Sequence, residues 1–288
     1  MQYRVKTTSL LASIALTVAT TAAQAEIWSS TEIHLQYGNL DKAFQGGSSA
    51  AETDGTFVTT FQHAGGWKYG DNFFFIDHLN YGKTDAEAAD GRHSDDEFYG
   101  EWYSNFSLGA ITGNEIKFGP IKDIGLIAGF NFAPEVDTLY YLPGVRLALD
   151  IPGFAFANLD IMAYIQNGSS APADNVSIKE DDSWIVDFNW AYPFKIGGTS
   201  WSIEGHMEYI EGADQDVRVI IPGGVINDTG ERESWILAQP QLRFDLGEAI
   251  GGTAGQLFVG IEYQFWKNKL GDDDTDESVV QALAVWHF

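Results

Sequence analysis

Apolar and polar residues alternate along most of the chain, in segments of about ten residues bounded by clusters of Gly, Asp, Asn and Pro. In one such segment Val259, Ile261 and Tyr263 alternate with Gly260 and Glu262. Successive side chains of a β-strand point to opposite faces, so this period predicts amphipathic strands with one apolar, aromatic face and one polar face. A chain built from such segments must form an all-β fold that covers the apolar face of every strand.

Twelve strands are predicted by this pattern. Their ranges are 27–37, 55–64, 72–81, 97–108, 121–132, 138–150, 156–166, 183–192, 200–210, 233–246, 256–266 and 278–288. In the seventh, Phe156, Met162 and Tyr164 share a face, which we assign to the apolar side. Alternation also occurs in soluble sandwiches and lipocalin-like barrels, so it does not by itself place the chain in a membrane.

The connections between these strands differ sharply in charge. The odd-numbered connections hold 24 Asp or Glu residues, whereas the even-numbered ones hold three. Long outer loops and short periplasmic turns are typical of outer-membrane barrels, and an even number of strands places both termini on the periplasmic side. We therefore predict a transmembrane, antiparallel, up-and-down β-barrel of about twelve strands, with long acidic extracellular loops and short periplasmic turns.

The N-terminal segment reads as an export signal. Arg4 and Lys6 precede an apolar stretch from Leu10 to Ala19, and Ala23-Gln24-Ala25 is a small-x-small cleavage site. We expect residues 1–25 to be a secretory signal peptide and residues 26–288 to be a single barrel domain. The expected location is the outer membrane of a Gram-negative bacterium.

The composition excludes several functions. Without Arg4 and Lys6 the chain has 14 basic and 41 acidic residues, a formal charge of −27, which disfavours nucleic acid as a partner. There is no cysteine for disulfide or thiol chemistry. The six histidines show no HExxH spacing, no GxSxG occurs, and the acidic run 272–277 lacks the spacing of an EF-hand. The sequence therefore predicts neither an enzyme nor a cofactor or metal site.

Several ordered motifs carry a family resemblance over essentially the whole mature chain. They are FFFID at 73–77, YGEW at 99–102, GVRLALDIPGF at 144–154, QPQ at 239–241, GIEYQFWKNKLG at 260–271 and the terminal WHF at 286–288. This set resembles the Tsx and OmpK family of nucleoside-specific outer-membrane channels, and is nearer to the OmpK branch. The resemblance implies a narrow twelve-stranded barrel that passes nucleosides and deoxynucleosides passively. It also implies that the outer loops serve some bacteriophages as a receptor.

Polar stripes on three strands and one further carboxylate are candidates for lining the lumen. Tyr99 and Tyr103 flank Glu101, so a base could stack on a ring while the carboxylate accepts sugar hydroxyls. The full set of expected substrate-binding residues is Glu32, His34, Gln36, Tyr99, Glu101, Tyr103, Glu204, His206, Glu208 and Glu262. In an alternative interpretation these groups only hydrate the lumen or pair with Arg146, Arg243 and Lys117.

Three other functions stay open at this point. A structural or receptor barrel would bind phage or host through its loops without selective transport, and a general porin would pass small solutes without saturation. A barrel enzyme would need a catalytic set near the membrane boundary. Outer-membrane lipid and lipopolysaccharide are expected partners in every case.

Overall fold

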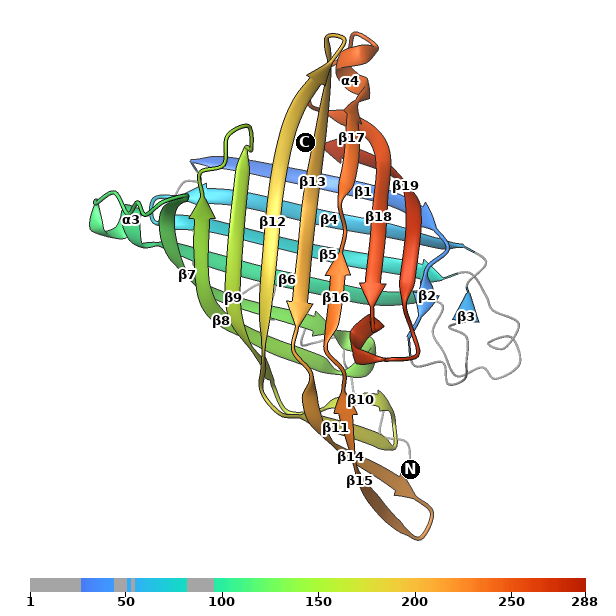
Figure 1. Cartoon of the computed structure of the whole chain (residues 1–288). Coiled ribbons are helices and arrows are strands. Elements are labelled where there is room, and N and C mark those ends of the chain that lie inside the picture. Colours follow the sequence, from blue (N-terminus) through green and yellow to red (C-terminus); the bar gives the residue numbers. More distant parts are fainter. Residues whose placement is uncertain (1–26, 44–50, 53–54, 82–95) are drawn as a thin grey trace.

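The computed structural model describes residues 27–43, 51–52, 55–81 and 96–288. The predicted signal peptide, and parts of the first two acidic connections, lie outside the described residues. The chain forms a closed barrel of twelve antiparallel strands, which confirms the predicted fold class (Figure 1). The described part contains no helix long and apolar enough to cross a membrane.

The barrel strands follow one another in chain order around the wall. They are β1 (Trp28–Gly38), β4 (Thr56–Trp67), β5 (Gly70–Tyr81), β6 (Asp96–Ser107), β7 (Ile121–Ala133), β8 (Thr138–Leu149), β9 (Phe156–Gln166), β12 (Ser183–Ile196), β13 (Thr199–Ile210), β16 (Trp235–Ala238) with β17 (Gln241–Asp245), β18 (Leu257–Lys267) and β19 (Glu277–His287). Pairing of β1 with both β4 and β19 closes the ring.

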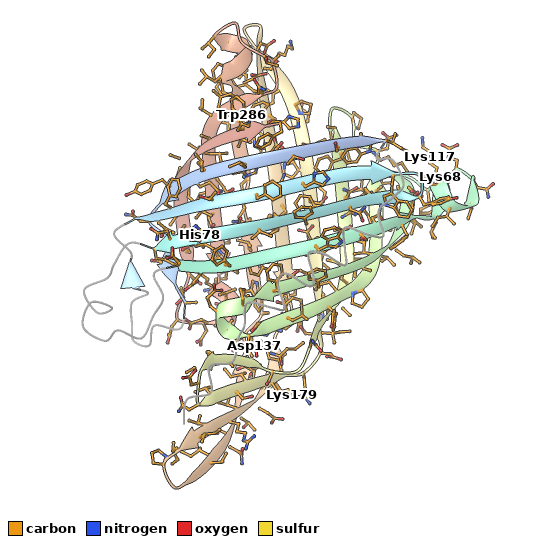
Figure 2. The ribbon with its side chains drawn as sticks, turned by 180° about the vertical axis from the view of Figure 1, so that it is seen from behind. Lys68, His78, Lys117, Asp137, Lys179 and Trp286 are labelled. Carbon is orange, nitrogen blue, oxygen red and sulfur yellow. The ribbon has the colours of Figure 1, made fainter. Side chains whose placement is uncertain are left out.

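The connections at the two ends of the barrel differ in structure as well as in charge. The acidic end carries the short pair β2 (Asp41–Lys42) and β3 (Ala51–Glu52), and the 3-10 helices η1 (Pro134–Val136) and η2 (Lys269–Gly271). The other end carries the short helices α3 (Leu108–Thr112) and α4 (Leu246–Ala249). Figure 2 labels Lys68 and Lys117 near this second end, and Asp137 and Lys179 near the acidic end.

Two of the acidic connections are not loops, contrary to the prediction for residues 167–182 and 211–232. They form a separate four-stranded sheet beyond the barrel, visible at the bottom of Figure 1. Its strands, in the order in which they pair, are β10 (Ser170–Ala173), β11 (Val176–Glu180), β14 (Ala213–Ile221) and β15 (Gly224–Arg232). Val176 and Ile178 lie opposite Val219 and Val217, so short apolar alternations inside acidic sequence are enough to pair these strands.

One barrel strand is interrupted at Gln239 and Pro240, between β16 and β17, where a single strand was predicted. Proline has no backbone N–H and cannot donate to a neighbouring strand. Opposite the break, Gly205 has a φ of +146°, and a side chain there would bring Cβ within 2.2 Å of the Gln239 carbonyl oxygen. The interruption directs the side chain of Gln239 towards His206, whose Nε2 is 2.7 Å from its Oε1.

The barrel wall has two chemically distinct faces. On β1 the outward Leu35 is 43% exposed, whereas the inward His34 is 2% exposed. The outer face carries exposed aliphatic side chains at mid-height, including Leu126, Ile161, Met207 and Ile261.

Aromatic side chains gather on the outer face towards both ends of the strands. Those near the acidic end are Tyr37, Phe57, Phe98, Tyr141 and Trp184, and those near the other end are Trp28, Phe106, Phe118, Tyr192 and Trp286. Two aromatic girdles around an apolar band are the pattern of a barrel wall that faces lipid.

Candidate functional site

The predicted lumen residues lie on the inner wall of the barrel, where most of them are buried among one another. Glu32, His34 and Gln36 are inward on β1, and Glu101, Glu208 and Glu262 are each less than 9% exposed. The alternation of the sequence therefore placed these stripes on the inner side of the wall.

Tyr99 and Tyr103 hold Glu101 from both sides along β6. Each hydroxyl donates to one oxygen of the Glu101 carboxylate, with an O–O distance of 2.8 Å for Tyr103. A carboxylate offers about four lone-pair sites, so two remain for a further donor. The tyrosine hydroxyls position Glu101 in the lumen, a role that the stacking hypothesis did not include.

Arg243 on β17 joins three of the predicted groups. Its Nη1 lies 3.1 Å from Glu32 Oε2 and 3.4 Å from Glu204 Oε2. Glu32 also accepts from His34 Nε2 at 2.8 Å. Glu204 is on the neighbouring strand β13, whereas Glu32 on β1 is separated from β17 by β18 and β19, so the Arg243–Glu32 ion pair crosses part of the lumen. The interpretation that the carboxylates pair with a lumen arginine is confirmed for Glu32 and Glu204.

Glutamine side chains extend this network to Glu262. Gln241 Nε2 donates to Glu262 Oε2 at 2.6 Å, and Gln281 Nε2 donates to Glu262 Oε1 at 3.0 Å. Gln241 in turn accepts from Arg243 Nε at 2.7 Å. The Glu262 carboxylate is held in a fixed orientation because an amide donor binds each of its two oxygens.

Arg146 forms a second ion cluster that the sequence did not reveal. Its guanidinium binds both oxygens of Asp160, at 2.8 and 2.6 Å, and Asp71 Oδ1 at 3.0 Å. The alternative interpretation paired Arg146 with the predicted lumen carboxylates, and for Arg146 that pairing is wrong. Lys117 is also no partner of theirs, since it lies at the rim, 3.8 Å from Asp150. Neighbouring-strand register, which a single sequence does not show, places Asp160 opposite Arg146.

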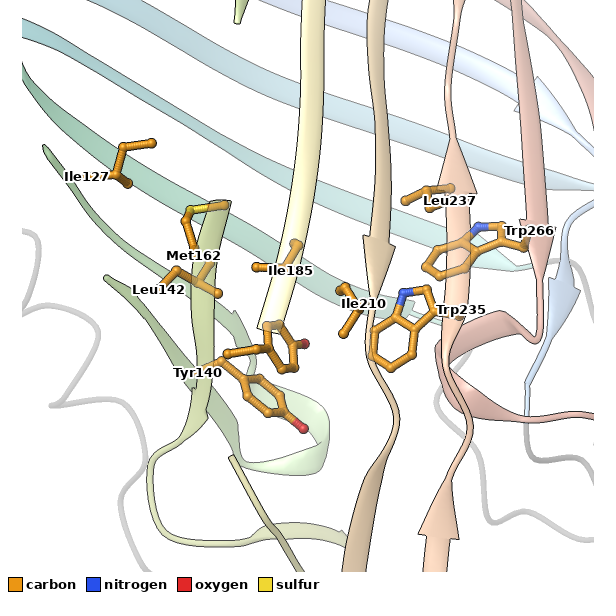
Figure 3. Close-up of a cluster of buried hydrophobic side chains, with 10 residues drawn as sticks. Ile127, Tyr140, Leu142, Met162, Ile185, Ile210, Trp235, Leu237 and Trp266 are labelled. Atoms are coloured by element: carbon orange, nitrogen blue, oxygen red, sulfur yellow. The ribbon is translucent and has the colours of Figure 1, made fainter. Parts of the chain in front are cut away.

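An apolar patch occupies the inner wall towards the acidic end, from β7 to β18 (Figure 3). We call its four aromatic residues, Tyr140, Tyr164, Trp235 and Trp266, the aromatic wall. Tyr140 and Tyr164 stack with ring centroids 4.1 Å apart, and Trp235 meets Tyr164 edge-on at 6.1 Å. Assigning Met162 and Tyr164 to the apolar outer face was wrong, because on β9 these side chains point inwards and are buried.

The base of the four-stranded extension contacts part of the aromatic wall. Arg232 lies over the Trp235 ring, 4.5 Å from its centroid, and donates to Glu180 Oε2 at 2.8 Å. Glu180 also accepts from the Tyr140 hydroxyl at 2.8 Å. The inner wall is therefore apolar and aromatic near the acidic end and strongly polar below it.

Comparison with known proteins gives likenesses in structure only. No protein-family model and no curated protein matches the sequence. Over 90% of its length the chain is similar to the NanC porin, at 10% identity and a TM-score of 0.44, covering 98% of that chain.

Two further structures share the barrel architecture. The toluene transporter TodX of Pseudomonas putida is 11% identical, with a TM-score of 0.35 and coverage of 91% of this chain and 89% of that one. The outer-membrane protease OmpT of Escherichia coli is 9% identical, with a TM-score of 0.33 and coverage of 93% and 100%. Likenesses of this degree carry no statement about substrate.

Proposed function

We propose that the chain is an outer-membrane channel of the Tsx and OmpK type, which passes nucleosides and deoxynucleosides by passive diffusion. The observation that carries the proposal is the division of the inner wall into an aromatic patch and an adjoining network of carboxylates and amides. A nucleoside has a flat base, which stacks on aromatic rings, and a hydroxylated sugar, which donates to carboxylates. The motif resemblance supports the same substrate class.

In this proposal the apolar outer face of the barrel contacts membrane lipid. The two aromatic girdles match the two interfaces of a bilayer, and the apolar band between them matches its hydrocarbon. A barrel satisfies its backbone hydrogen bonds between strands, as a wall in lipid requires.

In this proposal the charge of the lumen favours the passage of neutral solutes over anions, and its width favours small solutes over large ones. Its carboxylates, among them Glu101, Glu208 and Glu262, outnumber its guanidinium groups, so a phosphate group is repelled. With twelve strands, the lumen is wider than that of an eight-stranded barrel, which side chains fill, and narrower than the channel of a sixteen-stranded porin. The ion pairs of Arg146 and Arg243 narrow it further. These features disfavour a general porin.

Conductance in planar bilayers tests the proposal. Thymidine or adenosine should reduce the ion current saturably, because the bound nucleoside occupies the conducting path, whereas ribose and AMP should do so weakly. A current indifferent to every nucleoside up to its solubility limit would favour a general porin, and absence of current would favour a structural or receptor barrel.

The orientation of the barrel is tested by labelling intact cells. The chain has no cysteine, so a single introduced one is the only thiol target. Thr229→Cys, exposed on β15, should react with an impermeant maleimide, and Thr253→Cys, exposed after α4 at the opposite end, should not. The β14–β15 hairpin would then be the outward surface that we propose for phage contact. Labelling at Thr253→Cys alone would show that the barrel has the opposite orientation in the membrane.

A further inference from the structure

Two carboxylates face each other inside the lumen. Among the described residues, no arginine or lysine forms an ion pair with either of them. Asp187 on β12 is directly opposite Glu208 on β13. Like charges in directly opposed positions destabilise a sheet, and burial increases the cost. Glu208 is 7% exposed, and the Asp187 side chain is 13% exposed. The pair therefore calls for a positive charge between its oxygens.

His206 stands beside this pair. A carboxylate oxygen of Asp187, a ring nitrogen of His206 and a carboxylate oxygen of Glu208 all lie within 4.8 Å of one another. His206 Nδ1 is 3.4 Å from Asp187 Oδ1. That oxygen is buried and has no hydrogen-bond partner among the residues that the structure describes. The Nδ1 nitrogen of His206 and an Asp187 oxygen that accepts no described hydrogen bond thus lie next to each other.

A chain of amides fixes which nitrogen of His206 carries the proton. Glu277 accepts from Gln264 Nε2, which leaves Gln264 Oε1 to accept from Gln239 Nε2 at 3.0 Å. Gln239 Oε1 is then the acceptor that faces His206 Nε2 at 2.7 Å, so Nε2 holds the hydrogen. In the neutral imidazole the lone pair is therefore on Nδ1, the nitrogen directed at Asp187.

Asp187 is held in the same way. Its Oδ2 accepts from Asn189 Nδ2 at 2.6 Å, which turns Oδ1 towards His206. Asn189 Oδ1 in turn accepts from Asn158 Nδ2 at 2.9 Å. Metal-binding histidines and carboxylates are oriented by hydrogen bonds of this kind to their other atoms.

We propose that Asp187, His206 and Glu208 form a binding site for a divalent transition-metal ion such as Zn²⁺. One imidazole and two carboxylates suit zinc-like ions better than Mg²⁺ or Ca²⁺, which prefer oxygen ligands alone. Tetrahedral zinc ligands stand about 3.3 Å apart, so the three atoms must close in by at most about 1.5 Å, which rotation of the Glu208 side chain can supply.

The lumen leaves the remaining coordination positions to water or to a passing solute. Glu101 on β6 is a further buried carboxylate of the inner wall, which adds to the attraction of the lumen for a cation. A metal ion held here would exchange through the lumen and interrupt ion flow while bound. This role is independent of whether the barrel passes nucleosides.

Titration of the folded, full barrel in detergent with Zn²⁺ tests the site by calorimetry. One equivalent should bind, and Asp187→Asn and His206→Gln should each lower the affinity at least about 100-fold. Gln239→Ala, which removes only the orienting hydrogen bond, should lower it about 10-fold. The matched control is the double variant Asp273→Asn and Asp274→Asn in the exposed acidic run, which should bind like wild type. Co²⁺ should report the same site by its visible absorption.

Absence of Zn²⁺ binding by the wild-type barrel would overturn the proposal, and would show that His206 serves as a protonated partner of the two carboxylates. Equal binding by wild type and by His206→Gln would overturn it as well. Heat-modifiable migration in gels shows that each variant is folded. Nucleoside block of His206→Gln in bilayers is measured separately, so failure of the metal site and failure of the nucleoside channel are distinguishable.

Discussion

Replacing Arg146 with methionine should lower the free energy of unfolding of the barrel by about 3–5 kcal/mol, because it leaves the buried Asp160 carboxylate without its cation. The Asp160 side chain is 2% exposed and receives both of its short guanidinium contacts from Arg146. Asp71 loses its ion pair in the same variant. Urea unfolding in lipid vesicles, followed by tryptophan fluorescence, measures the loss.

Two further variants separate the buried charge from the loss of packing. Adding Asp160→Asn to Arg146→Met should restore part of the stability, because the deeper carboxylate is then neutral. Lys117→Met removes an exposed ion pair at the rim and should change stability by only about 0–1 kcal/mol. An Arg146→Met barrel as stable as Lys117→Met would show that water, and not the ion pairs, satisfies these aspartates.

Replacing Trp235 with leucine should raise the concentration of thymidine that halves the channel current by about 10-fold to 100-fold. Stacking of one base on an aromatic ring contributes about 1–3 kcal/mol, and a factor of ten corresponds to about 1.4 kcal/mol. Leucine keeps the surface apolar and removes the ring. Tyr164→Leu, at the neighbouring position of the aromatic wall, should act in the same direction.

The matched control for these variants is Trp184→Leu on β12. Trp184 points outwards and is 44% exposed on the outer face, so its loss should leave nucleoside block unchanged. If thymidine halves the current through Trp235→Leu at the same concentration as through Trp184→Leu and wild type, the aromatic wall is a packing feature. It then takes no part in binding the base.

The barrel was predictable because its signal is local. Alternation along each strand and turn residues between strands mark all twelve barrel strands, and β9 begins and ends where expected. The four-stranded extension was missed because its strands are short and lie in connections rich in Asp, Glu, Gly and Pro, which favour the interpretation as loops. The apolar residues that pair there, such as Val217 and Ile178, become informative only once their partner strands are known.

The inner wall was predictable only in part. Glu32, His34 and Gln36 share a face through the period of one strand, and that face is inward as expected. Arg243, the partner of Glu32, is 211 positions away from it, and no local pattern encodes that contact. The position of Tyr164 was mispredicted because the inner wall changes from polar to apolar along the barrel axis. A rule that places every apolar side chain on the outer face of the barrel therefore fails on β9.

Closure of the ring through β1 and β19 also governs how the protein can fold. Ser30 and His287, whose side chains meet at this seam, are 257 positions apart in the chain. Contacts between residues so distant in sequence carry a large loop-closure entropy and slow folding. The seam cannot form before β19 has been synthesised, so until then the seam edge of β1 has no partner strand. Loss of that strand would leave β1 and β18 as open edges, which are templates for aggregation.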